Sequence, residues 1–597
     1  MFQSTTAVLF AFALLLSDGI RASSPAEPDA IWSSIIPSAR LQYHSCYGHL
    51  QCARLMVPLD WNQSSNASTA FPTTDNQTAI LAVIKLPAIV SPSHPRYGGT
   101  IITNPGGPGA SGVVDLALYG QQIRKEFDSA QKHFDLVSFD PRGVLFSTPH
   151  ALCFEDDVER ERWNAQANAI GCLDSGEQAI TLLWARAKAL GRLCEGEDGR
   201  REGIFRHMST AVVARDMLAL VDEIESHHQL SQVDVMPEPG AQAPLHERVE
   251  MEAPLPKLMF WGFSGGTILG ATFATMYPDR VERMVLDGVV NADDYMSNSW
   301  ITTFENTEEV VQTFYQTCFD AGAMRCALFH ADGPQAIEED VKAILEQARH
   351  RPLATLRQTS SLIPEIVTYS DIKKFIFWSL FSPLHTFPVL AQGLADIKFG
   401  NGTLVLQATH PVPRNQCVDH SPDTSNNVYP GFLEEVLPAI SCSDSTSQSS
   451  QTLSSFKSYL RDVESRSPTI GAIWAQHNRL ACTGWTIRPA WRFTGPFGWN
   501  HTTSSPTRIL FVGNTRDPVT PLASAKYMAE KFSGSAVLVQ DCAGHGYNAA
   551  PSRCREEVVR KYFDTGEVES DVVECAVEKV PFEEGTIGYY RHTFGWT

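Results

Sequence analysis

The chain has 597 residues, of which 43% are hydrophobic and 19% are charged, a composition that is ordinary for a globular protein. This length exceeds what one small core needs, and it predicts a large domain with insertions or several domains. The formal net charge of −20 argues against a nucleic-acid partner, because binding to phosphates needs clustered Lys and Arg.

The N-terminal segment has the pattern of a secretory signal. Ala7 to Leu16 is an unbroken apolar run, and a short polar stretch follows it up to Ala22. This run suits the core of a signal peptide and is too short to span a bilayer. We expect residues 1–22 to be a signal peptide cleaved near Ala22; an uncleaved anchor is the alternative. No later segment reaches about 18 uninterrupted apolar residues, so no other membrane span is expected and the mature protein should be extracellular or in the secretory lumen.

Sequons and cysteines agree with secretion. Acceptor sites for N-glycosylation occur at Asn62, Asn66, Asn76, Asn401 and Asn500. Most of the 13 cysteines should pair in an oxidising compartment. Local spacing favours Cys46–Cys52, Cys318–Cys326 and Cys554–Cys575, Cys442–Cys482 is a plausible longer bridge, and Cys153, Cys172 and Cys194 are close enough to share one pair. The odd count leaves at least one thiol that is free or pairs between chains, and without CxxC or a zinc-like His/Cys spacing we expect neither metal nor cofactor.

Residues 40–290 alternate between strand-like and helix-like segments. Strands are expected at 78–86, 99–104, 134–139, 257–262 and 283–287, and helices at 113–127 and 211–224. Such alternation favours a mostly parallel, doubly wound sheet. Residues 150–206 are charged and helical and look like an excursion from the core, while the polar, Pro-rich residues 225–256 look like a surface insertion.

A serine lies at the centre of this half of the chain. Ser264 occupies the middle of Gly262-Phe-Ser264-Gly-Gly266, a G-x-S-x-G pattern that arises by chance in roughly one chain in five of this length. An apolar strand precedes it and a helix of small and apolar residues follows, which favours the nucleophile elbow of an α/β-hydrolase over a simple Gly-rich turn. A Cβ at either flanking glycine would crowd the neighbouring strand or helix.

The second half of the chain differs in composition and in expected secondary structure. Residues 291–480 are helical and aromatic-rich, which predicts an inserted helical cap. Strands resume at 508–512 and 536–539, so residues 481–597 should complete the α/β-hydrolase core. Four aromatic residues at helical spacing in the cap are expected in its core rather than along a substrate pocket: Phe375, Phe377, Trp378 and Phe381.

An acid and a base follow the last two expected strands. Asp517 comes after strand 508–512 and His545 after strand 536–539, at the carboxyl ends where sites of such sheets lie. The order nucleophile, acid, base matches an α/β-hydrolase triad. We therefore expect Ser264 to attack a carbonyl carbon, His545 to move its proton and Asp517 to hold the imidazole. Asp287, also at a strand end, is the alternative acid.

Backbone N–H groups complete the expected site. The dense glycines after strand 99–104 mean either a tight turn or backbone exposed for contact, and in this fold that loop donates to the oxyanion. Gly265 and either Gly106 or Gly107 are the expected donors.

Five stretches together resemble the tripeptidyl aminopeptidase-like (TAP-like) serine hydrolases, relatives of prolyl iminopeptidases. They are Asn104-Pro-Gly-Gly-Pro-Gly-Ala-Ser-Gly112, Asp140-Pro-Arg-Gly143, Gly262-Phe-Ser-Gly-Gly-Thr267, Tyr277 to Val290, and Asp517-Pro-Val-Thr-Pro521 with Gly544-His-Gly546. The resemblance implies a secreted exopeptidase that acts on free N-termini, with a helical cap and a C-terminal module that carries acid and base. Two features depart from the family: Gly265 stands where Tyr is more common, and the 225–256 insertion is longer than usual.

Three functions remain open at this stage. The first is a serine exopeptidase, for which cap acids such as Glu305, Glu308 and Glu309 are candidates to bind the substrate ammonium. The second is an esterase, or a biosynthetic or detoxifying hydrolase, because the same triad cleaves esters and amides. The third is a non-catalytic binding protein. The expected partner is a peptide or a small ester or amide, and the sequence leaves the oligomeric state open.

Overall fold

The computed structural model describes residues 28–62, 77–200, 203–233, 255–358, 362–410, 435–499 and 508–583. The expected signal peptide, the sequons at Asn66, Asn76 and Asn500 and most of the 225–256 insertion lie outside these residues. Asn62 and Asn401 are both exposed. No helix in the described ranges is long and apolar enough to cross a membrane.

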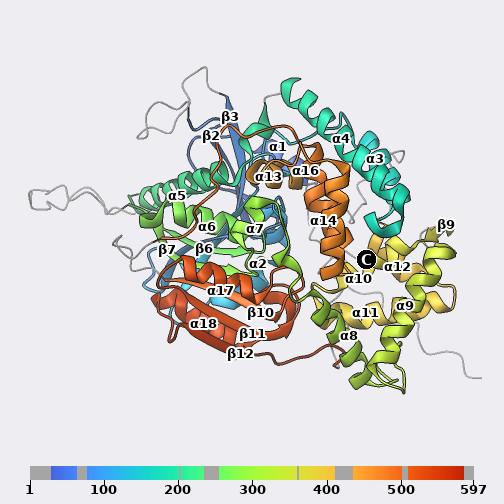
Figure 1. Cartoon of the computed structure of the whole chain (residues 1–597). Coiled ribbons are helices and arrows are strands. Elements are labelled where there is room, and N and C mark those ends of the chain that lie inside the picture. Colours follow the sequence, from blue (N-terminus) through green and yellow to red (C-terminus); the bar gives the residue numbers. More distant parts are fainter. Residues whose placement is uncertain are drawn as a thin grey trace, which may run out of the picture.

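A ten-stranded sheet in the order β1-β2-β3-β5-β4-β6-β7-β10-β11-β12 runs through the molecule (Figure 1). Its first three pairings, from β1 to β5, are antiparallel, and the remaining pairings are parallel. The strands are β1 His44–Cys46, β2 Leu50–Pro58, β3 Thr78–Leu86, β4 Tyr97–Asn104, β5 His133–Phe139, β6 Leu258–Phe263, β7 Val281–Asp287, β10 Ile509–Arg516, β11 Ala536–Ala543 and β12 Val572–Ala576. The doubly wound, mostly parallel sheet is thereby confirmed, and all seven expected strands are present.

Helices cover both faces of the sheet. On one face α2 (Gly112–Phe127) and α18 (Arg553–Thr565) pack over the central strands; on the other lie α5 (Thr210–Val233), α6 (Gly266–Met276) and α17 (Leu522–Lys531). Every residue of β5 and β6 is buried, as expected for strands that are covered by helices on both faces. Coverage on both faces leaves the carboxyl ends of the parallel strands as the place for a site.

A second hydrophobic cluster lies beside the sheet, on the right of Figure 1. Its helices from residues 291–480 are α8 Thr307–Ala321, α9 Pro334–His350, α10 Tyr369–Ser379, α11 Pro383–Lys398, α12 Thr403–Thr409, α14 Leu453–Arg466 and α15 Gly471–Ala475. Three nearby helices contribute buried residues to the cluster around the sheet instead: α7 Ala292–Ser297, α13 Val436–Asp444 and α16 Ala481–Gly484. A two-stranded hairpin, β8 (Leu353–Gln358) with β9 (Leu362–Val367), interrupts them and was not expected from the sequence.

The charged segment 150–206 packs with these helices rather than standing apart. It forms α3 (Asp157–Ile170) and α4 (Glu177–Arg200). Lys373 on α10 donates to Asp174 (2.6 Å), and the Cys172 amide donates to Ser370 (2.9 Å). A Cβ on Gly191 of α4 would lie 1.8 Å from the Gly484 carbonyl oxygen, so the two backbones touch there. We call α3, α4 and the helices of the second hydrophobic cluster together the helical layer. This helical layer is built from two segments that are distant in sequence.

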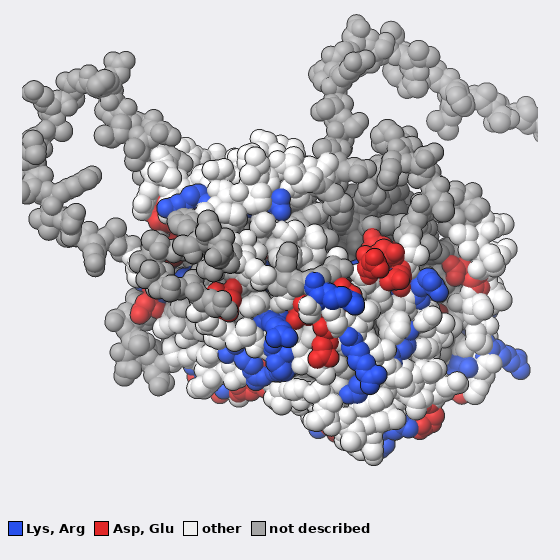
Figure 2. All heavy atoms as spheres, turned by 90° about the horizontal axis from the view of Figure 1, so that it is seen from above, with Lys and Arg blue, Asp and Glu red and all other residues white. Residues whose placement is uncertain are grey.

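Charged side chains are mixed on the face that Figure 2 shows. Lys and Arg lie next to Asp and Glu over much of this face, and the described residues form no continuous basic stripe there. Arg142 and Asp216, by contrast, form an ion pair that is fully buried in the core (2.5 Å). Because Arg142 also donates to the Pro58 and Leu59 carbonyl oxygens, its charge is held within the fold and is not offered to a partner.

Five disulfides agree with the spacing argument. The structure contains Cys46–Cys52, Cys318–Cys326, Cys442–Cys482 and Cys554–Cys575, and it resolves the three-cysteine ambiguity as Cys153–Cys194. Cys172 and Cys542 are free and buried. Bridges of very different span therefore hold the described chain.

Removal of the Cys442–Cys482 bridge by a double Cys→Ala replacement is expected to lower the free energy of unfolding substantially. The bridge closes a separation of 40 residues, and loop-closure entropy then corresponds to about 4 kcal/mol. Urea unfolding measures the loss. The matched control is the Cys46–Cys52 pair, equally buried but separated by 6 residues, for which about 2 kcal/mol is expected. An equal or larger loss in the control would contradict the entropic account.

Candidate active site

The turn after β6 holds Ser264 in a strained conformation. Ser264 has φ of 51°, in the left-handed region that non-glycine residues seldom adopt. Its amide donates to the Asp287 carbonyl oxygen (2.9 Å), and its own carbonyl accepts from Thr267 Oγ1 (2.6 Å). A Cβ on Gly266 would lie 2.6 Å from the Asn104 carbonyl oxygen, so only glycine fits between elbow and β4. The strand, turn and helix expected around Ser264 are confirmed.

Asp517 and His545 meet at the ends of β10 and β11. His545 Nδ1 lies 2.9 Å from Asp517 Oδ2 and 3.1 Å from Oδ1, so an Nδ1–H donates to the carboxylate and Nε2 is left as the basic nitrogen. Asp517 is fully buried, and its Oδ1 also accepts from the amides of Val519 (2.9 Å) and Thr520 (2.8 Å). The carboxylate is therefore fixed by backbone donors on one side and by the imidazole on the other.

The pKa of His545 is raised above its ordinary value. Burial alone lowers the pKa of the imidazole, but the charge and hydrogen bond of Asp517, together with the charge of Asp287, outweigh it. The surroundings of His545 therefore stabilise its protonated form relative to an isolated imidazole.

Thr520 is part of this arrangement, and the sequence analysis missed it. Its hydroxyl donates to Asp517 Oδ2 (2.8 Å) and lies 3.0 Å from His545 Nδ1. It stands in the stretch Asp517-Pro-Val-Thr-Pro521, but no residue pattern says that its side chain points back to the pair. The hydroxyl fixes the carboxylate oxygen that faces the imidazole.

Thr520→Val is expected to lower kcat/KM by about 10-fold, because it removes one hydrogen bond to a charged carboxylate without changing the shape of the side chain. Thr520→Ser, which keeps the hydroxyl, is the control and should stay within about 3-fold of the wild type. Steady-state kinetics with a chromogenic ester or anilide measures both variants. Equal loss in the Val and Ser variants would show that packing, not the hydroxyl, matters.

Phe381, between α10 and α11, and Asn514 of β10 hold the His545 loop. The His545 amide donates to the Phe381 carbonyl oxygen (2.8 Å), and the Phe381 ring meets the imidazole edge-to-face at 5.4 Å. Asn514 Nδ2 donates to the carbonyl oxygens of Gly544 (2.8 Å) and Gly546 (2.9 Å). Phe381 thus lies against the His545 imidazole. Of the other three aromatics expected in the core, Phe375 and Phe377 are buried and Trp378 is 45% exposed.

The glycine loop after β4 lies against the elbow. Gly106 and Gly107 have φ of 96° and 102°, and a Cβ on Gly106 would lie 2.7 Å from the Gly265 nitrogen. The Gly106 N–H already donates to Asn104 Oδ1 (3.1 Å), so we favour Gly107 over Gly106 as the partner of Gly265. A Cβ on Gly265 would lie 2.8 Å from Gly107 C and Pro108 N, which explains why this chain has no larger residue there.

Asp287, the alternative acid, is near this site but is not the partner of the imidazole. It is 1% exposed, and its Oδ2 has no hydrogen-bond partner among the described residues. Burial raises the pKa of its carboxyl to about 7. The geometry therefore favours Asp517 as the acid and leaves a second carboxyl beside the base.

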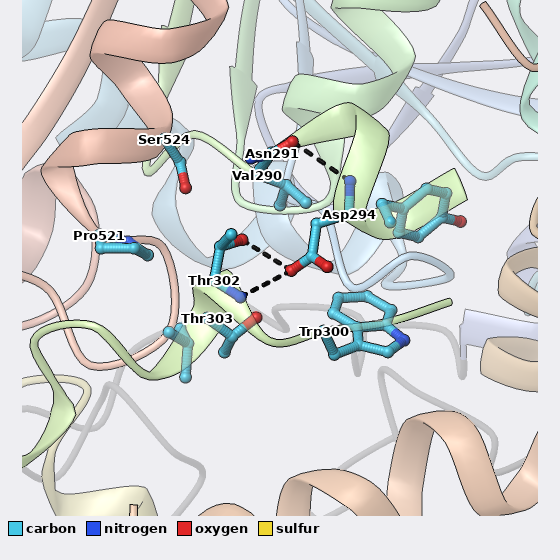
Figure 3. Close-up of a pocket in the computed structure, with 10 residues that line it drawn as sticks. Val290, Asn291, Asp294, Trp300, Thr302, Thr303, Pro521 and Ser524 are labelled. Atoms are coloured by element: carbon cyan, nitrogen blue, oxygen red, sulfur yellow. Dashed lines mark hydrogen bonds between the residues drawn. The ribbon is translucent and has the colours of Figure 1, made fainter. Parts of the chain in front are cut away.

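A small cavity lies behind the loop that carries Asp517 (Figure 3). It measures about 10 Å³, enough for about one water, and Val519 and Pro521 form one wall. Asp294 fills the opposite side, where it accepts from the Thr302 amide (2.9 Å) and hydroxyl (2.6 Å). The Thr307 hydroxyl donates to the Pro518 carbonyl oxygen (2.7 Å). These contacts support the loop from behind and leave no room for a substrate.

A larger cavity of about 960 Å³ opens at the ends of β10 and β11. Its walls include Glu308 and Glu309 of α8 together with Cys542, but neither Ser264 nor His545 lines it. Both carboxylate oxygens of Glu308 accept hydrogen bonds from Ser467 or Thr469, and Glu309 accepts from Asn306. The hydrogen bonds of Glu308 make it a support for the helical layer. No described group of three His, Cys, Asp or Glu is arranged to hold a metal ion.

Comparisons with known proteins agree with this geometry. A sequence model of the family described as "alpha/beta hydrolase fold" matches residues 99–324, which contain the glycine loop and Ser264. A second, described as "TAP-like protein", matches residues 467–575, which contain Asp517 and His545. The two halves of the candidate site therefore fall in two recognised regions.

Relatives with different printed activities align over most of the chain. "Serine protease Hip1" of Mycobacterium tuberculosis (strain ATCC 25618 / H37Rv) is 23% identical over 554 residues, 88% of each chain. "Tripeptidyl aminopeptidase" of Streptomyces lividans is 24% identical over 540 residues, 89% of this chain and 84% of that protein. "Carboxylesterase B" of Mycobacterium tuberculosis (strain CDC 1551 / Oshkosh) is 24% identical over 544 residues, 88% of this chain and 86% of that protein.

Proposed function

The chain is a serine hydrolase of the α/β-hydrolase fold with a TAP-like C-terminal region, and from this premise we propose that Ser264, His545 and Asp517 are its catalytic triad. The observation that carries the proposal is the His545–Asp517 pair of 2.9 Å at the strand ends, in a fold whose elbow presents Ser264. Relatives of this type are peptidases or esterases, so the substrate is a peptide or an ester.

The proposed mechanism is acyl transfer. Ser264 Oγ attacks the substrate carbonyl carbon while His545 Nε2 takes the hydroxyl proton, and Asp517 stabilises the imidazolium that forms. The N–H groups of Gly265 and Gly107 bind the oxyanion. His545 then protonates the leaving group, and water, activated by the same nitrogen, releases the acyl group from Ser264.

We propose that the leaving group is, first of all, the amine of a peptide bond near a free N-terminus. Two relatives carry the printed names of a serine protease and a tripeptidyl aminopeptidase. In this proposal residues 291–480 form a cap, and a secretory signal at 1–22 directs the chain to a compartment in which its disulfides are stable. The second candidate is an esterase, which the relative named carboxylesterase B favours.

One substrate panel separates these functions. The purified protein is assayed with aminoacyl- and tripeptidyl-p-nitroanilides, with their N-blocked versions and with p-nitrophenyl esters. Cleavage of the free-N-terminus anilides alone supports the exopeptidase, and cleavage of the esters alone supports the esterase. No turnover, with no labelling of Ser264 by a fluorophosphonate, would overturn both and leave a binding protein.

Activity is expected to fall on the acid side, below a midpoint that lies above the ordinary His value of 6.5. The base must be neutral, and the pKa of His545 is raised, so kcat/KM is full above that pKa and is lost as the pH decreases through it. A pH profile of kcat/KM between pH 4 and 9 measures the midpoint. A flat profile between pH 4 and 8 would count against His545 as the base.

A further inference from the structure

Asp287 connects the nucleophile to the neighbouring strands. It is the last residue of β7, where it pairs in register with Phe263 on one side and Val512 on the other. Its carbonyl oxygen accepts the Ser264 amide (2.9 Å). The main chain of Asp287 is therefore fixed directly beneath the elbow, and its side chain has little freedom to move away.

The carboxyl of Asp287 faces the His545 loop. A Cβ on Gly546 would lie 3.8 Å from Asp287 Oδ1, and a Cβ on the following Gly288 would lie 3.1 Å from His545 Cε1. The side chain is nevertheless buried with Oδ2 unpartnered, an arrangement that costs free energy when the group is charged. An Asn or a Leu would pack at this position without the cost of a buried charge. Packing alone therefore does not explain a carboxyl beside a titrating imidazole.

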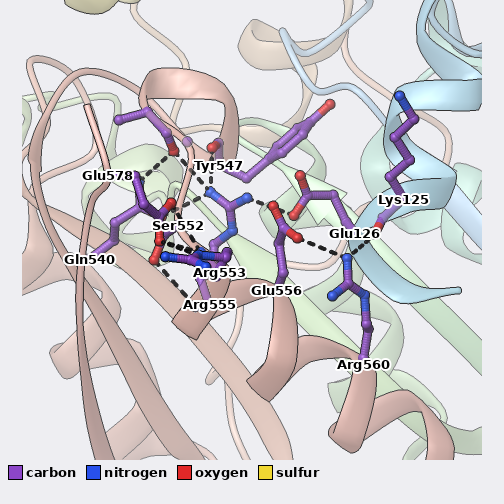
Figure 4. Close-up of polar contacts among 12 residues, drawn as sticks. Lys125, Glu126, Gln540, Tyr547, Ser552, Arg553, Arg555, Glu556, Arg560 and Glu578 are labelled. Carbon is purple, nitrogen blue, oxygen red and sulfur yellow. Dashed lines mark hydrogen bonds and ion pairs between the residues drawn. The ribbon is translucent and has the colours of Figure 1, made fainter. Parts of the chain in front are cut away.

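The buried cation Arg555 makes no hydrogen bond to this carboxyl among the described contacts, although its Nε is also without a partner. Arg555 on α18 is buried, and its guanidinium donates to Gln540 Oε1 (2.8 Å), to the Tyr547 carbonyl oxygen (2.5 Å) and to Glu126 Oε2 (2.6 Å) (Figure 4). The groups that shift the pKa of Asp287 after burial are Arg555 and His545, which lower it, and Glu126 and Asp517, which raise it. Arg555 and the imidazole therefore both act on this carboxyl through charge and not through a hydrogen bond, and of the two only the imidazole changes its charge between about pH 5 and 8.

We propose that Asp287 is a positioning residue for His545, a second carboxyl that stabilises the protonated imidazole together with Asp517. It neither contacts substrate nor replaces Asp517 in orienting Nδ1. The inference rests on the proposed triad. The two neighbouring groups titrate as a coupled pair, so a proton gained by His545 favours loss of the proton from Asp287, and the charge of Asp287 in turn raises the pKa of His545.

Asp287→Asn removes the charge and keeps the shape. We expect the acid limb of kcat/KM to move to lower pH by about 0.5–1 unit, because an anion near the imidazole is lost. The plateau of kcat should fall about 3- to 10-fold, because the imidazolium in the transition state is less stabilised, and KM should stay within about 2-fold. An acid limb that coincides with that of the wild type would overturn the proposal.

The matched control is Asp444→Asn, on α13. Asp444 is also a buried carboxyl, with a pKa that burial raises to about 6, but its partners are Thr210 and Tyr295 and not the His545 loop. Its replacement should leave the acid limb in place. If both variants move the limb equally, burial of a carboxyl in general and not its place beside His545 is responsible, and the proposal fails.

A double-mutant cycle with Asp517→Ala tests the cooperation of the two carboxyls. If both carboxyls stabilise one imidazolium, the loss of one matters more when the other is already missing. The factor by which Asp287→Asn lowers kcat should then be about 3 to 10 times larger in the Asp517→Ala background than in the wild type. The same factor in both backgrounds would contradict a shared role. If Ser264→Ala retains activity, the triad fails first; if Ser264→Ala is inactive and Asp287→Asn keeps the wild-type profile, only the present inference fails.

Stability against pH checks that the Asn variant is folded and that the carboxyl is buried as described. The folded pKa of about 7 exceeds the ordinary 3.8, so the folded state holds this proton more tightly and ionisation weakens the fold as the pH rises between these values. Relative to the wild type, Asp287→Asn should gain more in unfolding midpoint at pH 8 than at pH 5. Should the Asn variant not fold, Asp287→Glu gives the same readout, with a displaced acid limb expected and an unmoved one contradicting the proposal.

Discussion

Replacement of Ser264 by Ala is expected to lower kcat/KM by about 10⁵- to 10⁶-fold, the effect of losing a nucleophile that acts as one unit with its base. Ala also fits the elbow: the replacement removes only Oγ, while the amide that donates to Asp287 and the carbonyl that accepts from Thr267 remain. The unfolding midpoint should therefore stay close to that of the wild type. Hydrolysis of p-nitroanilides and p-nitrophenyl esters and labelling by a fluorophosphonate measure the loss.

A control serine keeps this experiment specific. Ser458 is an exposed residue of α14, and Ser458→Ala should have wild-type activity and labelling. Retention of more than about a thousandth of the activity in Ser264→Ala, on amides and esters alike, would show that the nucleophile is elsewhere, because the oxyanion site and binding alone leave a residual rate far below that.

Asp517→Asn is expected to lower kcat by about 10⁴-fold with little change in shape. The amides of Val519 and Thr520 require an acceptor, so the Asn carbonyl oxygen must face them. The Asn NH₂ group then faces His545 Nδ1 and donates to it, which moves the ring hydrogen to Nε2. A nitrogen that already carries a hydrogen cannot take the proton of Ser264.

The control for this variant is Asp541→Asn on β11, a carboxylate with 71% of its side chain exposed. It removes the same charge from a neighbouring strand and should leave kcat within about 2-fold, since exposed charges interact weakly. Steady-state kinetics at the pH optimum and a thermal unfolding scan are the measurements. Comparable losses in the two variants would mean that net charge near the sheet edge, and not the tautomer of His545, governs the rate.

Much of the fold was accessible from sequence because it depends on local pattern. β3 was predicted with both of its ends, and the strands before Ser264, Asp517 and His545 were recognised from short apolar runs bounded by turns. Chain order together with strand ends is enough to bring Ser264, Asp517 and His545 to one edge of a parallel sheet. Four cysteine pairs also followed from spacing alone.

The rest depends on contacts between distant segments. Nothing near α4 predicts that Gly191 will touch Gly484, and so residues 157–200 could not be assigned to the helical layer. The roles of Thr520, Asn514 and Phe381 depend on where their side chains or carbonyls end in space. The strands β12 and β9 alternate between exposed and less exposed residues but bury only one residue each, so they offer no continuous apolar run to recognise in the sequence.

The hydrogen bond from the His545 amide to the Phe381 carbonyl oxygen joins two segments that are made at different times during synthesis. Ser264 is synthesised first, Phe381 between α10 and α11 follows, and His545 comes last, so the His545 amide bonds to a segment that is made before it. In the proposed triad, a nascent chain that ends before His545 has the elbow but lacks the proton acceptor. If Ser264, His545 and Asp517 form the proposed triad, hydrolysis can begin only after residues 517–545 have been synthesised and have joined the sheet.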